Sequence, residues 1–255
     1  MKLYLPCVQC TQQTSGKIYN SIEVEYAEEG YYHFVCPNGH DNFIILQEQK
    51  FETLFQIGGN AILDGYYREA VSSFTSALER FYEFCVQIFC HKHKIDEKQI
   101  EDCRKFYKNS SERQFGSFLF LYLQEFKEIP FTKNEDDKWR KFRNDVIHNG
   151  RIPTKNEAIE YGNMVRKFIL TTILKLRNEH NEELNNLILK NTQERGKHNT
   201  FGCPSSTMCN PNLVSLVNGE LEKELNKDFI TCLEDMNKMN NAFLSLHKNS
   251  NIPLF

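Results

Sequence analysis

The sequence has 255 residues, of which 40% are hydrophobic and 13% are aromatic. This is enough apolar material to fill a core, so the composition excludes a largely disordered chain. A formal net charge of −3 excludes a protein whose whole surface attracts nucleic acid, so any such binding has to be local.

The sequence also bears on the location of the protein in the cell. The first residues lack the apolar run of a signal peptide, and no stretch approaches the roughly 18 apolar residues that a membrane span needs. Nine cysteines are an odd number, which fits a reducing compartment better than a set of disulfides. We therefore expect a soluble, cytoplasmic protein without a membrane partner.

Residues 1–49 are expected to form a small β domain. Residues 17–26 alternate polar and apolar types, and residues 31–35 and 42–46 are rich in types that favour strands. The segment carries two basic and six acidic side chains, which makes it a poor surface for a phosphate backbone. An ordering role, or recognition of a regulatory protein partner, is expected instead.

Two pairs of candidate metal ligands lie in this β domain. Cys7 and Cys10 are separated by two residues, Cys36 and His40 by three, and an expected β-hairpin lies between the pairs. This spacing predicts a zinc ribbon with a closed tetrahedral site, and four protein ligands make the zinc structural because no position stays open. Zinc binding contributes about 10 kcal/mol to folding, which would explain how a segment with little core folds.

Other arrangements of these residues remain open. His33 could replace His40, although its place in a strand suits a ligand turn less well, and the cysteines could be unconnected reduced thiols. Cys203 and Cys209 could hold a second metal ion, but no second ligand pair accompanies them.

Residues 50–190 are expected to form one helical bundle. Apolar side chains recur at spacings of three and four over residues 67–88, and a second helical region covers residues 97–127 with an interruption near 109–111. A helix capped at Asn134 should run to His148. Thr154 and Glu157 then form a capping box that opens another long helix.

Residues 191–255 are expected to be a loop followed by a C-terminal helix. Glycine, proline, asparagine and serine are frequent in residues 191–212, which is typical of a long loop. The pattern after this loop predicts a single amphipathic helix over residues 213–246.

The helix that ends at His148 carries the candidate catalytic side chains. On a helix turning about 100° per residue, Trp139, Phe142 and Val146 share one face, so this face should be buried. Asn144 and His148 lie one turn apart on nearly the opposite face. We therefore expect His148 to face water or a partner rather than the core.

Basic side chains accumulate around the same helix. Residues 138–155 contain six basic side chains and one acidic side chain. Such a run is often only a solvated helix face, but here Lys138, Lys141 and Arg151 are expected to bind the phosphates of RNA.

Arg143 and His148, separated by the polar Asn144 and three variable residues, resemble the ribonuclease motif of the HEPN superfamily. The stretches at 65–71 and 77–80 are similar to the long core helices of that family. The resemblance implies a mainly α protein, a helical bundle whose dimer brings two such motifs into one cleft, and a metal-independent endoribonuclease. Such proteins are often toxins or antiviral defence effectors. The zinc ribbon and the C-terminal region depart from the common helical domain.

The chemistry of these side chains fits that activity. Arg143 would hold the phosphate, Asn144 would position the phosphate or the imidazole, and His148 would transfer protons in a transesterification by the ribose 2′-hydroxyl. A non-catalytic module that binds RNA or a protein is the alternative, in which Arg143 and His148 only contact phosphate. His148 could also be an incidental residue at an exposed helix end. A nucleotide-modifying enzyme is a third reading, and no glycine-rich phosphate loop supports it.

Overall fold

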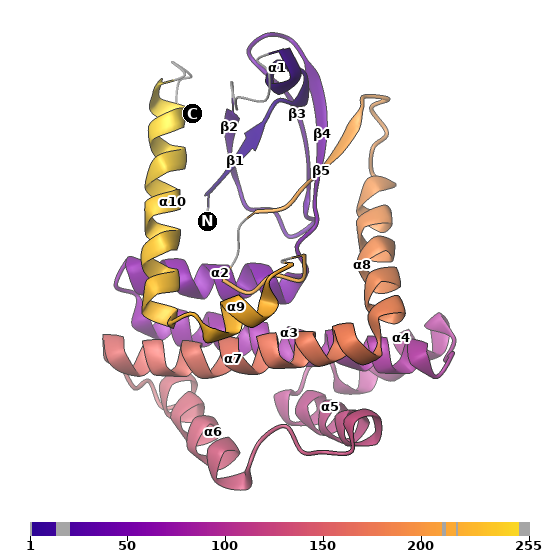
Figure 1. Ribbon diagram of the computed structural model, residues 1–255, viewed down its shortest axis with the longest axis vertical. Coiled ribbons are helices and arrows are strands. Elements are labelled where there is room, and N and C mark those ends of the chain that lie inside the picture. Colours follow the sequence, from indigo (N-terminus) through magenta and orange to yellow (C-terminus); the bar gives the residue numbers. More distant parts are fainter. Residues whose placement is uncertain (1, 14–20, 211–212, 218, 250–255) are drawn as a thin grey trace. The chain divides into compact units, whose positions relative to one another are not determined.

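The computed structural model describes residues 2–13, 21–210, 213–217 and 219–249 (Figure 1). The chain is mainly α with a small β region near its N-terminus, as the sequence predicts. It divides into two compact units, which we call the β unit (residues 1–48, 188–211 and 234–255) and the helical unit (residues 49–187 and 212–233). The segment 191–255 therefore contributes to both units. Among the described residues, no helix has the length and apolar character needed to cross a membrane.

The β unit contains two small sheets. Their strands are β1 (Lys2–Pro6), β2 (Ser21–Glu25), β3 (Tyr31–Val35), β4 (Asp41–Leu46) and β5 (Ser205–Met208). β1 and β2 pair antiparallel, and a short helix, α1 (Val8–Gln13), follows β1. In the second sheet β4 lies in the middle, antiparallel to β3 and parallel to β5.

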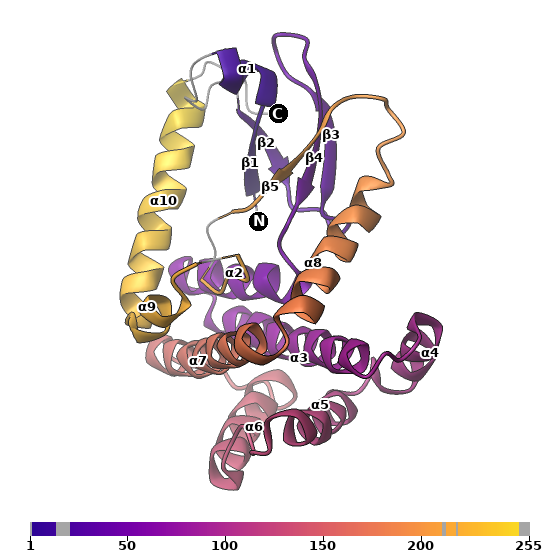
Figure 2. The same cartoon turned by 45° about the vertical axis from the view of Figure 1, so that its right-hand side comes forward.

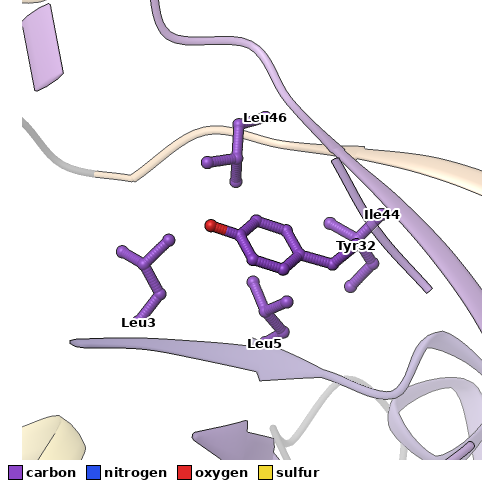
Figure 3. Packing of buried hydrophobic residues seen from close by; sticks show 5 residues of the cluster. All are labelled: Leu3, Leu5, Tyr32, Ile44 and Leu46. Carbon is purple, nitrogen blue, oxygen red and sulfur yellow. The ribbon is translucent and has the colours of Figure 1, made fainter. Parts of the chain in front are cut away.

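A cluster of apolar side chains lies in the core of the β unit (Figure 3). Leu3 and Leu5 of β1 face Tyr32 of β3, and Ile44 and Leu46 of β4 complete the cluster. The hydroxyl of Tyr32 accepts a hydrogen bond of 2.7 Å from the backbone N–H of residue 27, so its one polar atom is satisfied inside this core. The cluster joins the two sheets.

The strands expected at 31–35 and 42–46 are confirmed as β3 and β4. Residues 17–20 of the strand expected at 17–26 lie outside the described residues, and residues 21–25 form β2. The expectation of a plain loop at 191–212 is wrong at both ends. Residues 191–196 are the last turns of a helix, whose Arg195 donates to the backbone oxygens of Leu46 and Glu48, and residues 205–208 form β5, which pairs with β4.

The remaining helices run from residue 50 to residue 249. They are α2 (Lys50–Leu63), α3 (Tyr67–Lys92), α4 (Glu97–Tyr107), α5 (Ser111–Phe126), α6 (Lys133–Ile147), α7 (Lys155–Glu179), α8 (Asn181–Gly196), α9 (Leu221–Asn226) and α10 (Phe229–Asn249). In the helical unit α3 and α7 lie side by side, with α2 on one side of α3 and α5 and α6 on the other (Figures 1 and 2). α8 and α10 each have residues in both units.

Capping side chains fix where two of these helices begin. The Thr154 hydroxyl accepts from the Glu157 backbone N–H, and the Glu157 carboxylate accepts from the Thr154 backbone, so the predicted capping box of α7 is confirmed. α6 begins after Thr132 rather than at Asn134. Thr132 and Glu135 form the same reciprocal pair, which the expected cap at Asn134 would have lacked.

The expected single helix at 213–246 is wrong, because the chain breaks into α9 and α10. Arg166 of α7 is fully buried and needs acceptors for its guanidinium. It donates to the backbone oxygens of Leu213 at 2.9 Å and Glu224 at 2.8 Å. A continuous helix would have used these oxygens internally, so the irregular path satisfies the buried charge.

Phe74 of α3 fills the space where three helices meet. Its ring lies against two helical glycines, Gly58 of α2 and Gly162 of α7, and a Cβ added at these positions would lie 2.5 Å and 2.7 Å from the ring. The rings of Phe55 and Phe229 surround it at centroid distances of 4.6 Å and 6.2 Å. Only glycine leaves room for this packing.

We predict that Gly58→Ala lowers the free energy of unfolding by about 1–3 kcal/mol, because the added methyl group overlaps the Phe74 ring. Gly116→Ala is the matched control, since Gly116 is also helical and a Cβ there meets nothing within 4 Å. The control should gain about 0.5–1 kcal/mol from helix propensity. Urea denaturation measures both, and equal effects of the two substitutions would contradict the packing described.

Candidate functional site

The apolar face of α6 attaches this helix to α7. Val146 is buried, and the rings of Trp139 and Phe142 lie 5.9 Å and 5.5 Å from the ring of Tyr161. Trp139 and Phe142 are only half-buried, so the predicted buried face of the helix is confirmed in part. These contacts leave the opposite face of α6 directed away from α7.

Arg143 is held from two sides. One guanidinium nitrogen donates to a carboxylate oxygen of Glu79 on α3 at 2.9 Å, and another donates to the side-chain oxygen of Asn144 at 2.7 Å. The Arg143 side chain is only 12% exposed, so both bonds are shielded from solvent. Sequence reasoning missed Glu79, because nothing near it in the sequence distinguishes it from other acidic residues of a helix.

His148 lies at the C-terminal end of α6 and is exposed. The backbone N–H of His148 donates to the backbone oxygen of Asn144 at 2.9 Å, which places His148 one turn beyond Asn144 as expected. Its imidazole makes no hydrogen bond or ion pair with any described residue. Arg143 and Asn144 are therefore joined directly, whereas His148 is presented to solvent on the next turn.

Several other histidines whose side chains the structure describes are engaged. Carboxylates pair with His33, His91 and His93, and a cysteine sulfur lies beside His40. His180 also lacks a hydrogen bond, but it is buried, whereas His148 is exposed. An imidazole without a partner can exchange protons with a bound substrate without first breaking a contact.

Two of the predicted phosphate-binding side chains lie on α6, and the third follows shortly after the end of this helix. Lys138, Lys141 and Arg151 are all exposed. The Lys138 ammonium lies 4.3 Å from the Trp139 ring centroid, and Arg151 pairs with Glu157 while lying over the Phe142 ring. Lys138, Lys141 and Arg151 also line a common pocket of about 290 Å³. Asp145, Glu157 and Glu160 line the same pocket, so the three cations lie there among acidic side chains.

A second pocket, of about 400 Å³, lies beside Arg143 and Glu79. Aromatic side chains, including Trp139 and Tyr161, form much of its wall. Burial raises the pKa of Tyr161 to about 12, and its hydroxyl lies 2.9 Å from that of Thr75. Tyr161 therefore stays protonated at neutral pH and cannot act as a base in this pocket.

The four predicted metal ligands of the β unit converge. Cys7, Cys10 and Cys36 are buried, and their sulfurs and the Nδ1 atom of His40 all lie within 4.8 Å of one another. The Cys10 and Cys36 sulfurs are 3.8 Å apart, and Cys10 lies 3.2 Å from His40 Nδ1. Sulfurs bound at about 2.3 Å to a tetrahedral ion are separated by about 3.8 Å, so this set could hold a metal ion.

Local hydrogen bonds support the sulfurs of this metal-ligand set. The Cys10 backbone N–H points to the Cys7 sulfur at 3.5 Å, and the Asn38 amide donates to the Cys10 sulfur at 3.3 Å. Burial raises the pKa of the Cys7 thiol, and a bound cation would offset that cost by favouring the thiolate. His33 does not join the set, because its Nε2 atom pairs with Asp41 instead.

No family model, curated protein or solved structure matches the sequence. Function is therefore inferred from two groups of side chains. One is the Arg143, Asn144 and His148 group on α6, which can bind an anion and move protons. The other is the buried metal-ligand set.

We predict that Cys36→Ser removes the tightly bound metal ion from the Cys7, Cys10, Cys36 and His40 set, because serine is a poor replacement for a buried thiolate ligand. Cys103→Ser is the control, since Cys103 is exposed on α4. Metal analysis after dialysis should find less metal per chain in Cys36→Ser alone. Full retention of tightly bound metal in that variant would show that the set does not bind it.

Proposed function

We propose that this protein is an endoribonuclease that cuts RNA without a catalytic metal ion. The observation that carries the proposal is the free, exposed imidazole of His148, one turn beyond a guanidinium and an amide that are fixed together. The resemblance of these three residues to the HEPN ribonuclease motif supports the same activity. In keeping with that resemblance, we propose a toxin or antiviral defence effector that a regulatory partner restrains.

The reaction uses the ribose 2′-hydroxyl of the substrate. One His148 imidazole takes the proton from this hydroxyl as its oxygen bonds to phosphorus. The bond from phosphorus to the 5′-oxygen breaks, and a protonated imidazole gives its proton to that leaving oxygen. The product is a 2′,3′-cyclic phosphate, and only RNA carries the hydroxyl that the reaction requires.

Arg143 stabilises the phosphate as its negative charge grows. A guanidinium has five N–H donors, so Arg143 can keep its bonds to Glu79 and Asn144 and still donate to a phosphate oxygen. Glu79 would then orient the guanidinium, and Asn144 would hold it on the side of His148. Lys138, Lys141 and Arg151 contribute binding rather than chemistry.

One His148 supplies only one proton-transfer group, whereas the reaction needs an acid and a base. We therefore propose a homodimer in which the ends of two α6 helices share one cleft. The exposed position of His148 leaves it accessible to a second copy. The metal ion in the β unit is proposed to be zinc with a structural role, because a set of four ligands offers no open position.

The ion pair between Arg143 and Glu79 favours a second candidate function. The Glu79 carboxylate offsets the charge of Arg143, and this weakens the attraction of the guanidinium for a phosphate. A non-catalytic module that binds RNA or a protein would tolerate this. Cleavage by the purified chain distinguishes the two functions.

We predict that the purified chain cuts single-stranded or loop RNA in EDTA, and that His148→Ala slows cleavage by about 10² to 10⁴-fold, the usual contribution of an acid or base. Arg143→Ala should also abolish cleavage, and Asn144→Ala should lose less. His91→Ala, at the end of α3, is the matched control and should cut at the parental rate. A His148→Ala variant as fast as the parent would refute the proposed chemistry.

We also predict a homodimer in solution, because two imidazoles are needed in one cleft. Light scattering should give twice the chain mass at concentrations where cleavage occurs. If two chains form the site, dilution should lower the cleavage rate per chain as the dimer dissociates. The rate per chain of a site within one chain would not change in this way. A monomer with undiminished activity would contradict the shared cleft.

A further inference from the structure

A second group of metal-ligand side chains lies in the β unit, apart from the four-residue set. His33 on β3, Asp41 on β4 and Cys203, just before β5, place one ligand atom each within 4.8 Å of the others. His33 Nε2 and the Asp41 carboxylate are 2.7 Å apart. The three residues come from segments that only the folded chain brings together.

Strand register explains the meeting of His33 and Asp41. Val35 lies opposite Asp41, and His33 lies opposite Phe43, so His33 and Asp41 are on the same face of the antiparallel pair. Phe43 is also beside Ser205 of β5. The segment that leads into β5 therefore reaches the same face with Cys203.

Further contacts fix the positions of these groups. The Asn199 amide donates to the backbone oxygen of Cys203 and to the hydroxyl of Ser205, both at 2.8 Å, and this shapes the loop that carries the thiol. The Phe201 ring stacks on the His33 imidazole with centroids 3.6 Å apart and planes within 5°. The stacked ring holds the plane of the imidazole, so its Nε2 atom stays directed toward Asp41.

We propose that His33, Asp41 and Cys203 bind a second divalent transition-metal ion of the zinc class. Thiolate, imidazole and carboxylate are the ligand types that such ions accept together. On binding, the ion takes the place of the proton between His33 and Asp41, and the Cys203 thiol releases its proton to solvent. Ligands at about 2.0–2.1 Å from a tetrahedral ion are about 3.3 Å apart, so the His33–Asp41 pair has to open by roughly 0.6 Å.

The position of Cys203 distinguishes this site from an ordinary surface ion pair. A histidine and an aspartate can pair without a third group, but here a thiol completes a triangle of ligand atoms. Three protein ligands leave one coordination position for water or for a ligand from another molecule. The partly exposed His33 and Asp41 side chains give an ion access from solvent. A bound ion would tie the loop before β5 to the β3–β4 hairpin.

Cobalt(II) tests the proposal, because its bond to a thiolate absorbs light in the near ultraviolet. The full-length chain is first loaded with zinc and dialysed until one zinc ion per chain remains, so that the second site is empty, and Co²⁺ alone is then added. The zinc content is measured again at the end, so that exchange into the first set is detected. We expect one Co²⁺ per chain with thiolate absorption, independently of any ribonuclease activity.

Variants assign the absorption to this group. Cys203→Ser should lose the thiolate absorption and bind Co²⁺ about tenfold or more weakly, and His33→Ala should weaken binding by a similar factor. Cys209→Ser, a nearby exposed cysteine, is the control and should behave as the parent. The proposal is overturned if the zinc-loaded parent shows no cobalt–thiolate absorption. Persistence of that absorption in Cys203→Ser would also overturn it.

Discussion

The close approach of three helices around Phe74 is the constraint on which the helical unit depends. Phe74 contacts α2 and α7 at glycines, and a methyl group at either glycine would overlap the ring. The fully buried rings of Phe55 and Phe229 pack around it. Tight packing of this kind leaves little freedom to shift, so α7 has one position relative to α3. α6 in turn contacts both of these helices.

The candidate catalytic group is held by two contacts of α6. Tyr161, the residue before Gly162, receives the Trp139 and Phe142 rings, and Glu79 of α3 receives the guanidinium of Arg143. One contact is apolar and the other ionic, and both come from helices that pack around Phe74. Arg143 is thereby fixed while His148, past the end of the helix, has no side-chain partner in the described part of the chain. We therefore propose that Arg143 holds the phosphate and that His148 transfers the protons.

Local patterns predicted much of the fold, the helix that carries Arg143 and His148, and the four-residue metal-ligand set. The helical spacing of Trp139, Phe142 and Val146 identified the face of α6 that packs against the bundle, and the paired spacings in residues 7–40 identified the metal-ligand set. Contacts between distant segments could not be predicted in this way. β5 pairs with β4, a strand about 160 residues earlier in the sequence. Glu79 of α3 accepts a hydrogen bond from Arg143 of α6. Arg166 of α7 binds backbone oxygens in the segment where a single C-terminal helix was expected. Each depends on tertiary packing rather than on neighbours in the sequence.

We propose that this chain cuts RNA through the ribose 2′-hydroxyl with His148 as the proton-transfer group. The most direct measurement compares an RNA substrate with the same substrate carrying one 2′-deoxyribose on the 5′ side of the bond that is cut, both in EDTA. The account predicts a 2′,3′-cyclic phosphate end from the first substrate and no cleavage at the modified position of the second. Cleavage at the deoxyribose position would contradict it, because the attacking hydroxyl is absent there.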